Sequence, residues 1–188
     1  MRWQELFDDL EAQASALERT TTDAEISERT RGELARVVMG NRLRAQVGAR
    51  LTARVCGAGD ISGRLERVGA GWVLVVAESE LIVPTSALVW CVDLPLEAVS
   101  AEAVSVVSSR LGLASVLRAV ARDRSVVTVV TRDGTTVTGT PDRVGADFLD
   151  VAVHEVGDAP RRTQVRSRAT VPFEAIGCVR RRATGWEV

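Results

Sequence analysis

Seven arginines gather in a short region near the C-terminus of this 188-residue chain. A planar guanidinium group binds phosphate or carboxylate oxygens in bidentate fashion, so such a group of arginines is a candidate binding surface for RNA or another polyanion. The alternative is a solvated loop and tail, and no Phe, Trp or Tyr lies in the loop to stack on a base. The seven are Arg161, Arg162, Arg166 and Arg168, then Arg180, Arg181 and Arg182.

The sequence does not complete a catalytic or metal-binding combination. His154 is the only histidine, and in a strand it shares a face with Asp150. One histidine and one carboxylate make neither a metal site nor a catalytic triad. Asp147 and Asp150 are three apart in a strand and point to opposite faces, which does not suit an acid and base pair. We therefore predict a chain that is not an enzyme and has no catalytic residue, metal or cofactor.

Composition narrows the classes further. Hydrophobic residues make up 46% and charged residues 26%, which is typical of a folded globular chain. All 24 basic residues are arginine, yet the formal net charge is -1. This balance argues against a protein that coats nucleic acid through its overall charge, and it leaves a local basic face open.

Other features bear on location. The N-terminus reads MRWQE and lacks the basic and then apolar order of a secretory signal. No apolar stretch approaches the roughly 20 residues that span a bilayer, so no membrane association is expected. Cys56, Cys91 and Cys178 have no C-x-x-C spacing and fit reduced, buried thiols. Together these features predict a cytoplasmic location.

An amphipathic stripe marks the N-terminus. Its residues Trp3, Leu6, Phe7 and Leu10 recur at intervals of three and four, which predicts a helix. The residues 20–23 can end it and cap a second helix that runs toward Gly48, giving a helical hairpin. The stripe is a candidate docking surface for a protein partner, and the alternative is that it covers the protein's own core.

Two meanders of short strands are expected after the hairpin. Apolar runs broken by glycine, proline and Asp-Gly turns predict four strands in each meander. The predicted strands are Leu51–Cys56, Ile61–Val68, Trp72–Ala77 and Leu81–Val92, then Ser125–Thr131, Thr135–Arg143, Phe148–His154 and Thr170–Arg180. Helical patterns at Ala98–Leu111 and Ala114–Ala121 lie between them. The expected organisation is a helical hairpin at 1–48, a first barrel at 49–94, connecting helices at 95–124, and a second barrel with a basic loop and tail at 125–188.

The two meanders repeat one sequence. GRLERVGAGW, which begins at Gly63, has its counterpart GTPDRVGADF at Gly139, 76 residues later, with R-V-G-A identical. The dipeptide at Val83 recurs at Val171, 88 residues later, so the second copy holds 12 extra residues before its last strands. Duplication explains this better than coincidence. Glycines at matching positions suit a short sheet that bends sharply, so we predict that each copy closes into a small barrel behind a helix.

The second copy resembles the Sm-like (LSm) family, to which the bacterial RNA chaperone Hfq belongs. A helix precedes VVTVVTRDG, then GTTVTGTPDRVGADFLDVAV, then VPFEAIGCVR; the Gly134-x-x-x-x-Gly139 spacing is similar to the first Sm motif and Ile176-Gly177 to the second. The resemblance spans about residues 114–182, with a mirror at 34–92, and implies Sm-like barrels that bind RNA. The whole chain also resembles an actinobacterial family of hypothetical proteins that begins RWQELFDDLEAQ.

Two functions follow from the sequence. The first is a non-enzymatic α+β, mainly β, protein with two tandem Sm-like or SH3-like small barrels, the second of which presents arginines to RNA or another polyanion. The alternative is a scaffold or assembly module without a nucleic-acid ligand, which holds a protein partner or self-associates through barrel edges. A contiguous basic face favours the first, and arginines paired with Glu78, Glu80 or Asp158 favour the second.

Overall fold

The computed structural model describes residues 32, 34–99, 111–153 and 167–182. The chain divides into two units, residues 1–38 and Met39–Val188, and the named strands all belong to the second. The predicted helix with Trp3, Leu6, Phe7 and Leu10 lies outside the described residues, as do most of the predicted hairpin and residues 100–110 of the connecting segment.

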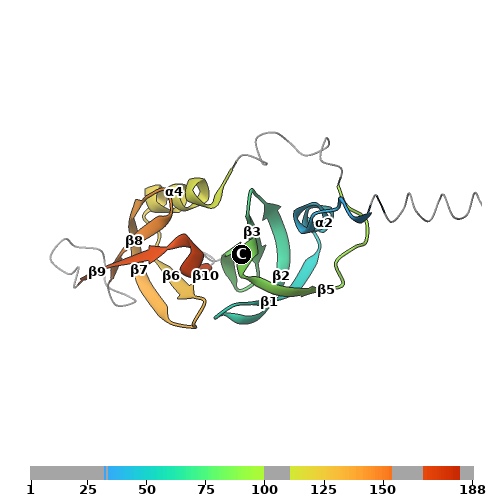
Figure 1. The fold of residues 1–188 in the computed structure, drawn as a ribbon. Helices are drawn as coiled ribbons and strands as arrows, with labels where there is room; N and C mark the ends of the chain where they lie inside the picture. Colours follow the sequence, from blue (N-terminus) through green and yellow to red (C-terminus); the bar gives the residue numbers. More distant parts are fainter. Residues whose placement is uncertain (1–31, 33, 100–110, 154–166, 183–188) are drawn as a thin grey trace, which may run out of the picture. The chain divides into compact units, whose positions relative to one another are not determined.

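The first strand set, β1 to β5, follows the short helix α2 (Met39–Ala45), as Figure 1 shows. Alternate residues of β1 are buried, because successive side chains of a strand point to opposite faces and only one face packs on the core. A single 3-10 turn separates the last two strands. The elements are β1 (Arg50–Val55), β2 (Gly59–Val68), β3 (Trp72–Val76), β4 (Ser79–Pro84), η1 (Thr85–Ala87) and β5 (Leu88–Val92).

The second strand set, β6 to β10, follows α4 (Leu113–Asp123), so the helix predicted at Ala114–Ala121 is confirmed. Gly112 precedes the helix in extended conformation, and Arg124 closes it with a left-handed φ of 52°. The strands and the 3-10 turn are β6 (Val127–Thr131), β7 (Thr136–Val144), β8 (Phe148–Val153), β9 (Ser167–Pro172), η3 (Phe173–Ala175) and β10 (Ile176–Arg182).

The prediction of two closed small barrels behind a helical hairpin is wrong, because the strands form one open antiparallel sheet in the order β5-β1-β2-β3-β4-β10-β6-β7-β8-β9. Closure would require β4 to pair with β5, and β9 with β10. Instead, η1 carries the chain back so that β5 pairs with β1, and η3 carries β10 to β6. The free side of β4 then pairs with β10 of the other set.

The two strand sets match each other in local geometry. The pairing register shifts between Leu65 and Arg67 in β2, and between Pro141 and Arg143 in β7, which are equivalent places. Such bulges bend a strand and increase its twist. The turn after each bulged strand is also the same, since the amide of Gly69 donates to Trp72 O at 2.9 Å and that of Gly145 donates to Phe148 O at 2.9 Å.

The close approach of neighbouring strands explains why glycine occupies the equivalent positions Gly63 and Gly139. A Cβ at Gly63 would lie 2.6 Å from the carbonyl oxygen of Val76 on β3. A Cβ at Gly139 would overlap the carbonyl oxygen of Ala152 on β8. A backbone carbonyl cannot move aside as a flexible side chain can, so only glycine lets the strands approach this closely.

Each strand set encloses a hydrophobic core, and the two sets exchange side chains. The first core contains Leu43 of α2 with buried residues of β1 to β4, and the second lies under α4. Val130 and Cys178 of the second set pack in the first core, whereas Trp72 and Ile82 of the first set pack in the second. The two sets therefore depend on each other for burial of these side chains.

Gly177 lies at a close backbone approach between the two strand sets. A Cβ at this position would overlap the carbonyl oxygen of Cys56, which belongs to the turn between β1 and β2. Gly57 in the same turn has a φ of 74°, and a Cβ there would overlap the carbonyl oxygen of Thr131. Side chains at either glycine would hold the two sets apart.

We predict that Gly177→Ala lowers the free energy of unfolding by about 1–3 kcal/mol, because the added methyl group meets backbone rather than a movable side chain. Denaturant unfolding followed by tryptophan fluorescence would measure this change. Gly40→Ala in α2 is the matched control, because its Cβ would meet only the Arg44 Nη1 atom at 3.4 Å, and it should leave stability equal or slightly higher. Wild-type stability for Gly177→Ala would contradict the close approach.

Candidate functional site

A strand ladder joins the two strand sets. Its register runs antiparallel from Val179 opposite Ile82 to Arg182 opposite Ser79. Beside the ladder, Arg132 Nη2 donates a hydrogen bond to Ser86 Oγ at 2.8 Å. The junction of β4 and β10 is thus made of backbone pairing, exchanged core side chains and polar contacts at its rim.

The side chain of Arg181 stabilises the junction through polar contacts outside the hydrophobic core. Its Nε donates to Glu80 Oε2 on β4 at 2.7 Å, and its Nη1 donates to Asp123 Oδ2 at the end of α4 at 2.8 Å. The side chains of Arg181 and Glu80 are only 34% and 32% exposed. One guanidinium group therefore holds β10, β4 and α4 together through two carboxylates.

The predicted arginine patch is not a single free surface in the described residues. Arg168 Nη2 donates to Asp142 Oδ2 at 2.7 Å, and Arg181 is held as above. Arg180 is exposed, and Arg182 takes part in the β10 ladder. Successive residues of a strand point to opposite faces, so three consecutive arginines in β10 cannot share one face. Arg161, Arg162 and Arg166 lie outside the described residues.

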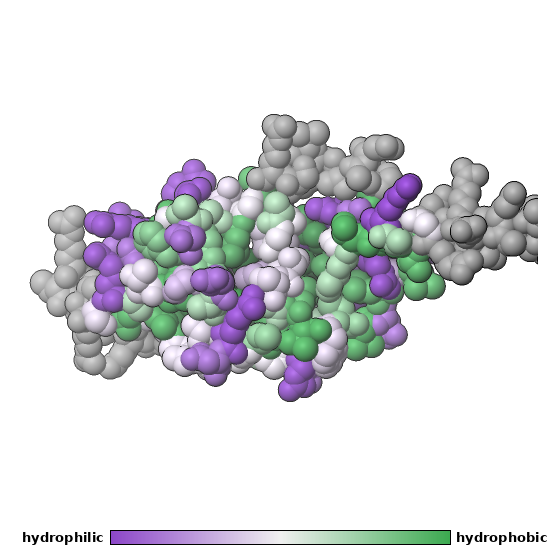
Figure 2. Space-filling model, viewed as in Figure 1, coloured by the Kyte–Doolittle hydropathy of each residue, from purple (hydrophilic) through white to green (hydrophobic). Residues whose placement is uncertain are grey.

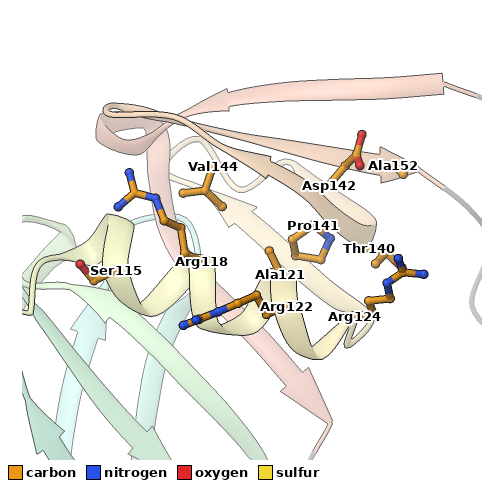
Figure 3. Close-up of a pocket in the computed structure, with 10 residues that line it drawn as sticks. All are labelled: Ser115, Arg118, Ala121, Arg122, Arg124, Thr140, Pro141, Asp142, Val144 and Ala152. Atoms are coloured by element: carbon orange, nitrogen blue, oxygen red, sulfur yellow. The ribbon is translucent and has the colours of Figure 1, made fainter.

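A different group of arginines lines an open cavity of about 940 Å³ between α4 and β7. In Figure 3, Arg118 and Arg124 reach toward β7, with Arg124 beside Thr140, whereas Arg122 runs along the helix. Arg118 Nη2 donates to Gly145 O at 3.1 Å. The opposite wall contains Thr140, Pro141 and Asp142 of β7 and Ala152 of β8.

The sequence interpretation missed this cavity, although a signal for it exists. Arg118 and Arg122 are four residues apart and therefore lie on the same side of α4. Leu117 of the same helix is buried and Val116 and Val120 pack against the second core, so the arginines occupy the outer side. Helical spacing of arginines between two strand patterns would have drawn attention to this helix.

Asp150 is the buried charged residue of the described part of the chain. It lies on β8 opposite Thr170 of β9, and Thr170 Oγ1 donates to Asp150 Oδ1 at 2.6 Å. The hydroxyl satisfies the carboxylate, which gives Asp150 a structural partner. Among the described residues there is no group of three or more metal-ligating side chains, and His154 lies outside them.

The cysteines are free thiols; Cys178 is buried, and Cys56 and Cys91 are half-buried. Burial raises the pKa of the Cys178 thiol, although the positive charge of Arg180 acts in the opposite direction. Burial also raises the pKa of the Cys91 thiol. Because the thiolate is the reactive form, neither environment activates a cysteine as a nucleophile.

The open sheet ends in two edge strands. β5 pairs with β1 on one side, and β9 pairs with β8 on one side; the described residues place no strand on the other side of either. Three of the five side chains on β5 are exposed, with Val89 at 55%, Trp90 at 40% and Val92 at 44%. Figure 2 shows hydrophobic surface, broken by hydrophilic groups, in the region of β1 and β5. Exposed edges of this kind are templates for pairing with another strand.

Comparisons with protein-family models, with curated proteins and with solved structures found no match to this chain. The resemblance to the Sm-like family therefore stays a prediction. In the part of the chain that the structure describes, no helix has the length and apolar character needed to cross a membrane.

We predict that Arg181→Gln destabilises the fold by about 1 kcal/mol, because it removes a partly buried ion pair that joins the strand sets. A double-mutant cycle with Glu80→Gln should give a coupling energy of about 0.5–1 kcal/mol that shrinks in high salt. Arg168→Gln, which breaks a more exposed pair with Asp142, is the control and should cost less. Equal effects of the two arginine substitutions would contradict a special role for Arg181.

Proposed function

We propose that this chain is a non-enzymatic assembly module that holds a protein partner through the edge strands of its sheet. The pairing of β4 with β10 carries this proposal, because there an edge of one strand set already captures an edge of the other. The corresponding strands at the two ends, β5 and β9, present free backbone groups in the described structure. Extended segments add to such edges through main-chain hydrogen bonds.

The pairing of the arginines supports the assembly function over polyanion binding through the predicted patch. Arg168 and Arg181 are both engaged by carboxylates, and Glu80 is one of those partners. A guanidinium group held by a carboxylate is partly neutralised and loses donors for phosphate. Among the patch arginines whose side chains the structure describes, Arg168, Arg180 and Arg181, only Arg180 is exposed and has no such ion pair.

An internal duplication accounts for the assembly geometry. Equivalent bulges, equivalent glycine turns and equivalent 3-10 turns in the two strand sets favour two copies of one five-stranded unit. A unit that pairs with its own copy within one chain has edges suited to further pairing.

The free thiols Cys56, Cys91 and Cys178 favour a reducing compartment, so we propose that the protein acts in the cytoplasm.

Site-specific photo-crosslinking in the cells that make the protein tests this function. A photoreactive residue at Val92 on β5 or at Ser167 on β9 should give crosslinked products of defined mass, because both side chains border a free edge. The same residue at Arg67, exposed on the interior strand β2, is the control and should give several-fold less product. Absence of protein crosslinks from both edges would overturn the proposal.

A second candidate function is binding of RNA or another polyanion in the cavity between α4 and β7. It is favoured by the side chains of Arg118, Arg122 and Arg124 along one wall. Asp142, which also lines the cavity, is partly neutralised by Arg168. Three guanidinium groups around an open cavity can contact several phosphates, and the contacts would be sensitive to salt.

For this second candidate, Arg122→Ser and Arg124→Ser should each weaken binding of single-stranded RNA by roughly two- to tenfold at low salt, through loss of one phosphate contact. Fluorescence anisotropy at two salt concentrations would measure the change. Arg67→Ser removes one exposed charge that is not part of the cavity and is the matched control. If wild-type protein binds neither RNA nor duplex DNA at low salt, this candidate fails.

A further inference from the structure

We infer that the partner of the sheet edges is a second copy of this chain, with β9 of one copy paired to β5 of the next. This inference rests on the proposed assembly function and names the partner for it. Its basis is the internal junction, where β4 pairs with β10. β9 is the equivalent of β4, because β4 immediately precedes the turn η1 and β9 immediately precedes the matching turn η3. β5 is the equivalent of β10, because these two strands immediately follow η1 and η3.

The internal register transfers directly to the contact between two chains. Equivalent residues of the last two strands differ by 88 in number, as Val83 and Val171 show. Val179 opposite Ile82 then becomes Cys91 of one copy opposite Thr170 of the next. The following internal pairs transfer to Val92 opposite Ala169 and Asp93 opposite Arg168.

Charge is complementary in this register. At the internal junction, acidic Glu80 on the β4 side faces basic Arg181 on the β10 side. At the transferred positions, basic Arg168 lies on the β9 side and acidic Asp93 follows β5. The signs are exchanged, but each pair is opposite in charge. Complementary charge at equivalent places favours this register over neighbouring ones, in which Asp93 would lie opposite an uncharged residue of β9 such as Ser167, Ala169 or Thr170.

Arg168 has donors for a second carboxylate. In one chain its Nη2 donates to Asp142. Arg181 at the internal junction shows that one guanidinium group at such a strand pair can hold two carboxylates, since it binds both Glu80 and Asp123. Asp93 of a second copy would be the second carboxylate for Arg168, beside Asp142 of its own chain. Asp93 has a φ of 51°, which ends β5, so the ladder between chains is short.

Other substitutions make the contact between chains weaker than the internal one. Thr170 and Ala169 replace the apolar Ile82 and Leu81 on the approaching strand. Val89 stands where the second set has Gly177, so the neighbouring turn cannot come as close as the Cys56 turn does internally. Exposed Trp90, at the position of buried Cys178, supplies apolar surface in return. The association is therefore reversible and depends on concentration.

The contact joins two different edges, so it is head-to-tail. Each added chain uses its β9 on one neighbour and its β5 on the other, and leaves one of each free at the ends. Such heterologous contacts make a closed ring where the rotation between copies closes, and an open filament where it does not. A symmetric two-fold dimer is not expected.

Charge reversal tests the register. Arg168→Glu and Asp93→Arg should each weaken self-association of the full chain by about tenfold or more, because each puts like charges face to face. An equimolar mixture of the two variants should associate as wild type does, since every contact between unlike chains is then complementary. Sedimentation velocity over a concentration series measures this. Failure of the mixture to associate better than either variant alone would overturn the register.

A disulfide trap tests the strand pairing itself. Thr170→Cys introduces a thiol opposite native Cys91 of the next copy in the transferred register. Oxidation should yield disulfide-linked oligomers, and peptide mapping should place the bond between positions 91 and 170. The same substitution with Cys91→Ser is the control and should remain unlinked. Oligomers joined through Cys56 or Cys178 instead would contradict the pairing.

The outcomes separate this inference from the proposed function. Wild-type protein that stays monomeric up to about millimolar concentration in sedimentation overturns a second copy as the partner. Crosslinks from Val92 and Ser167 to a different protein would then still support an assembly module. Absence of both self-association and edge crosslinks overturns both proposals together.

Discussion

The pairing of β4 with β10 is the contact on which the rest of the structure depends. Without it, the side chains of Ile82 and Trp72 would no longer be buried in the second core. Those of Cys178 and Val130 would no longer be buried in the first core. The backbone groups of two strands would also lose their partners, and an unsatisfied buried group costs about 1–3 kcal/mol. The two strand sets therefore resemble one another in sequence but do not stand as two independent barrels.

The local structure was largely predictable from the sequence because strand and turn signals are local. The apolar runs, the Asp133-Gly134 turn and the glycine-bearing repeats predicted β1 to β3 and β6 to β8 near their observed positions. The run Leu81–Val92 was predicted as one strand, yet η1 divides it after Pro84. Apolar content continues through the turn, so hydrophobicity could not show where the chain changes direction.

The topology could not be predicted because it is decided by contacts distant in sequence. A closed barrel, in which β4 pairs with β5, and the open sheet, in which β4 pairs with β10, need the same apolar pattern in β4. The two topologies differ only in which strand pairs with the free edge of β4. Gly177 and Cys56 decide between them, since their backbones fit closely across more than one hundred residues of chain. A glycine after Ile176 was visible in the sequence, but its partner was not.

The arginine patch shows the same limit for function. Arg168 and Arg181 lie within two residues of other arginines in the sequence, but their carboxylate partners Asp142, Glu80 and Asp123 come from elsewhere in the chain. The sequence shows that these arginines are near each other along the chain. It does not show which carboxylates pair with them in the fold, and that pairing determines whether an arginine is available to a ligand. Arg168 and Arg181 thus have structural contacts, whereas the arginines at α4, which line a cavity, were less conspicuous in the sequence.

The ends of the sheet differ from its interior in a way that suits controlled association. A chain that ended in two edges as apolar as Ile82 and Leu81 would aggregate through any strand it met. Ser167, Arg168 and Thr170 make β9 polar, and Thr170 already satisfies the buried carboxylate of Asp150 on β8. Polar side chains leave the backbone donors and acceptors of β9 in place, so they restrict which strand can pair without removing the capacity to pair. The selectivity then lies with the side chains that flank β5, where an acidic residue follows an exposed apolar run.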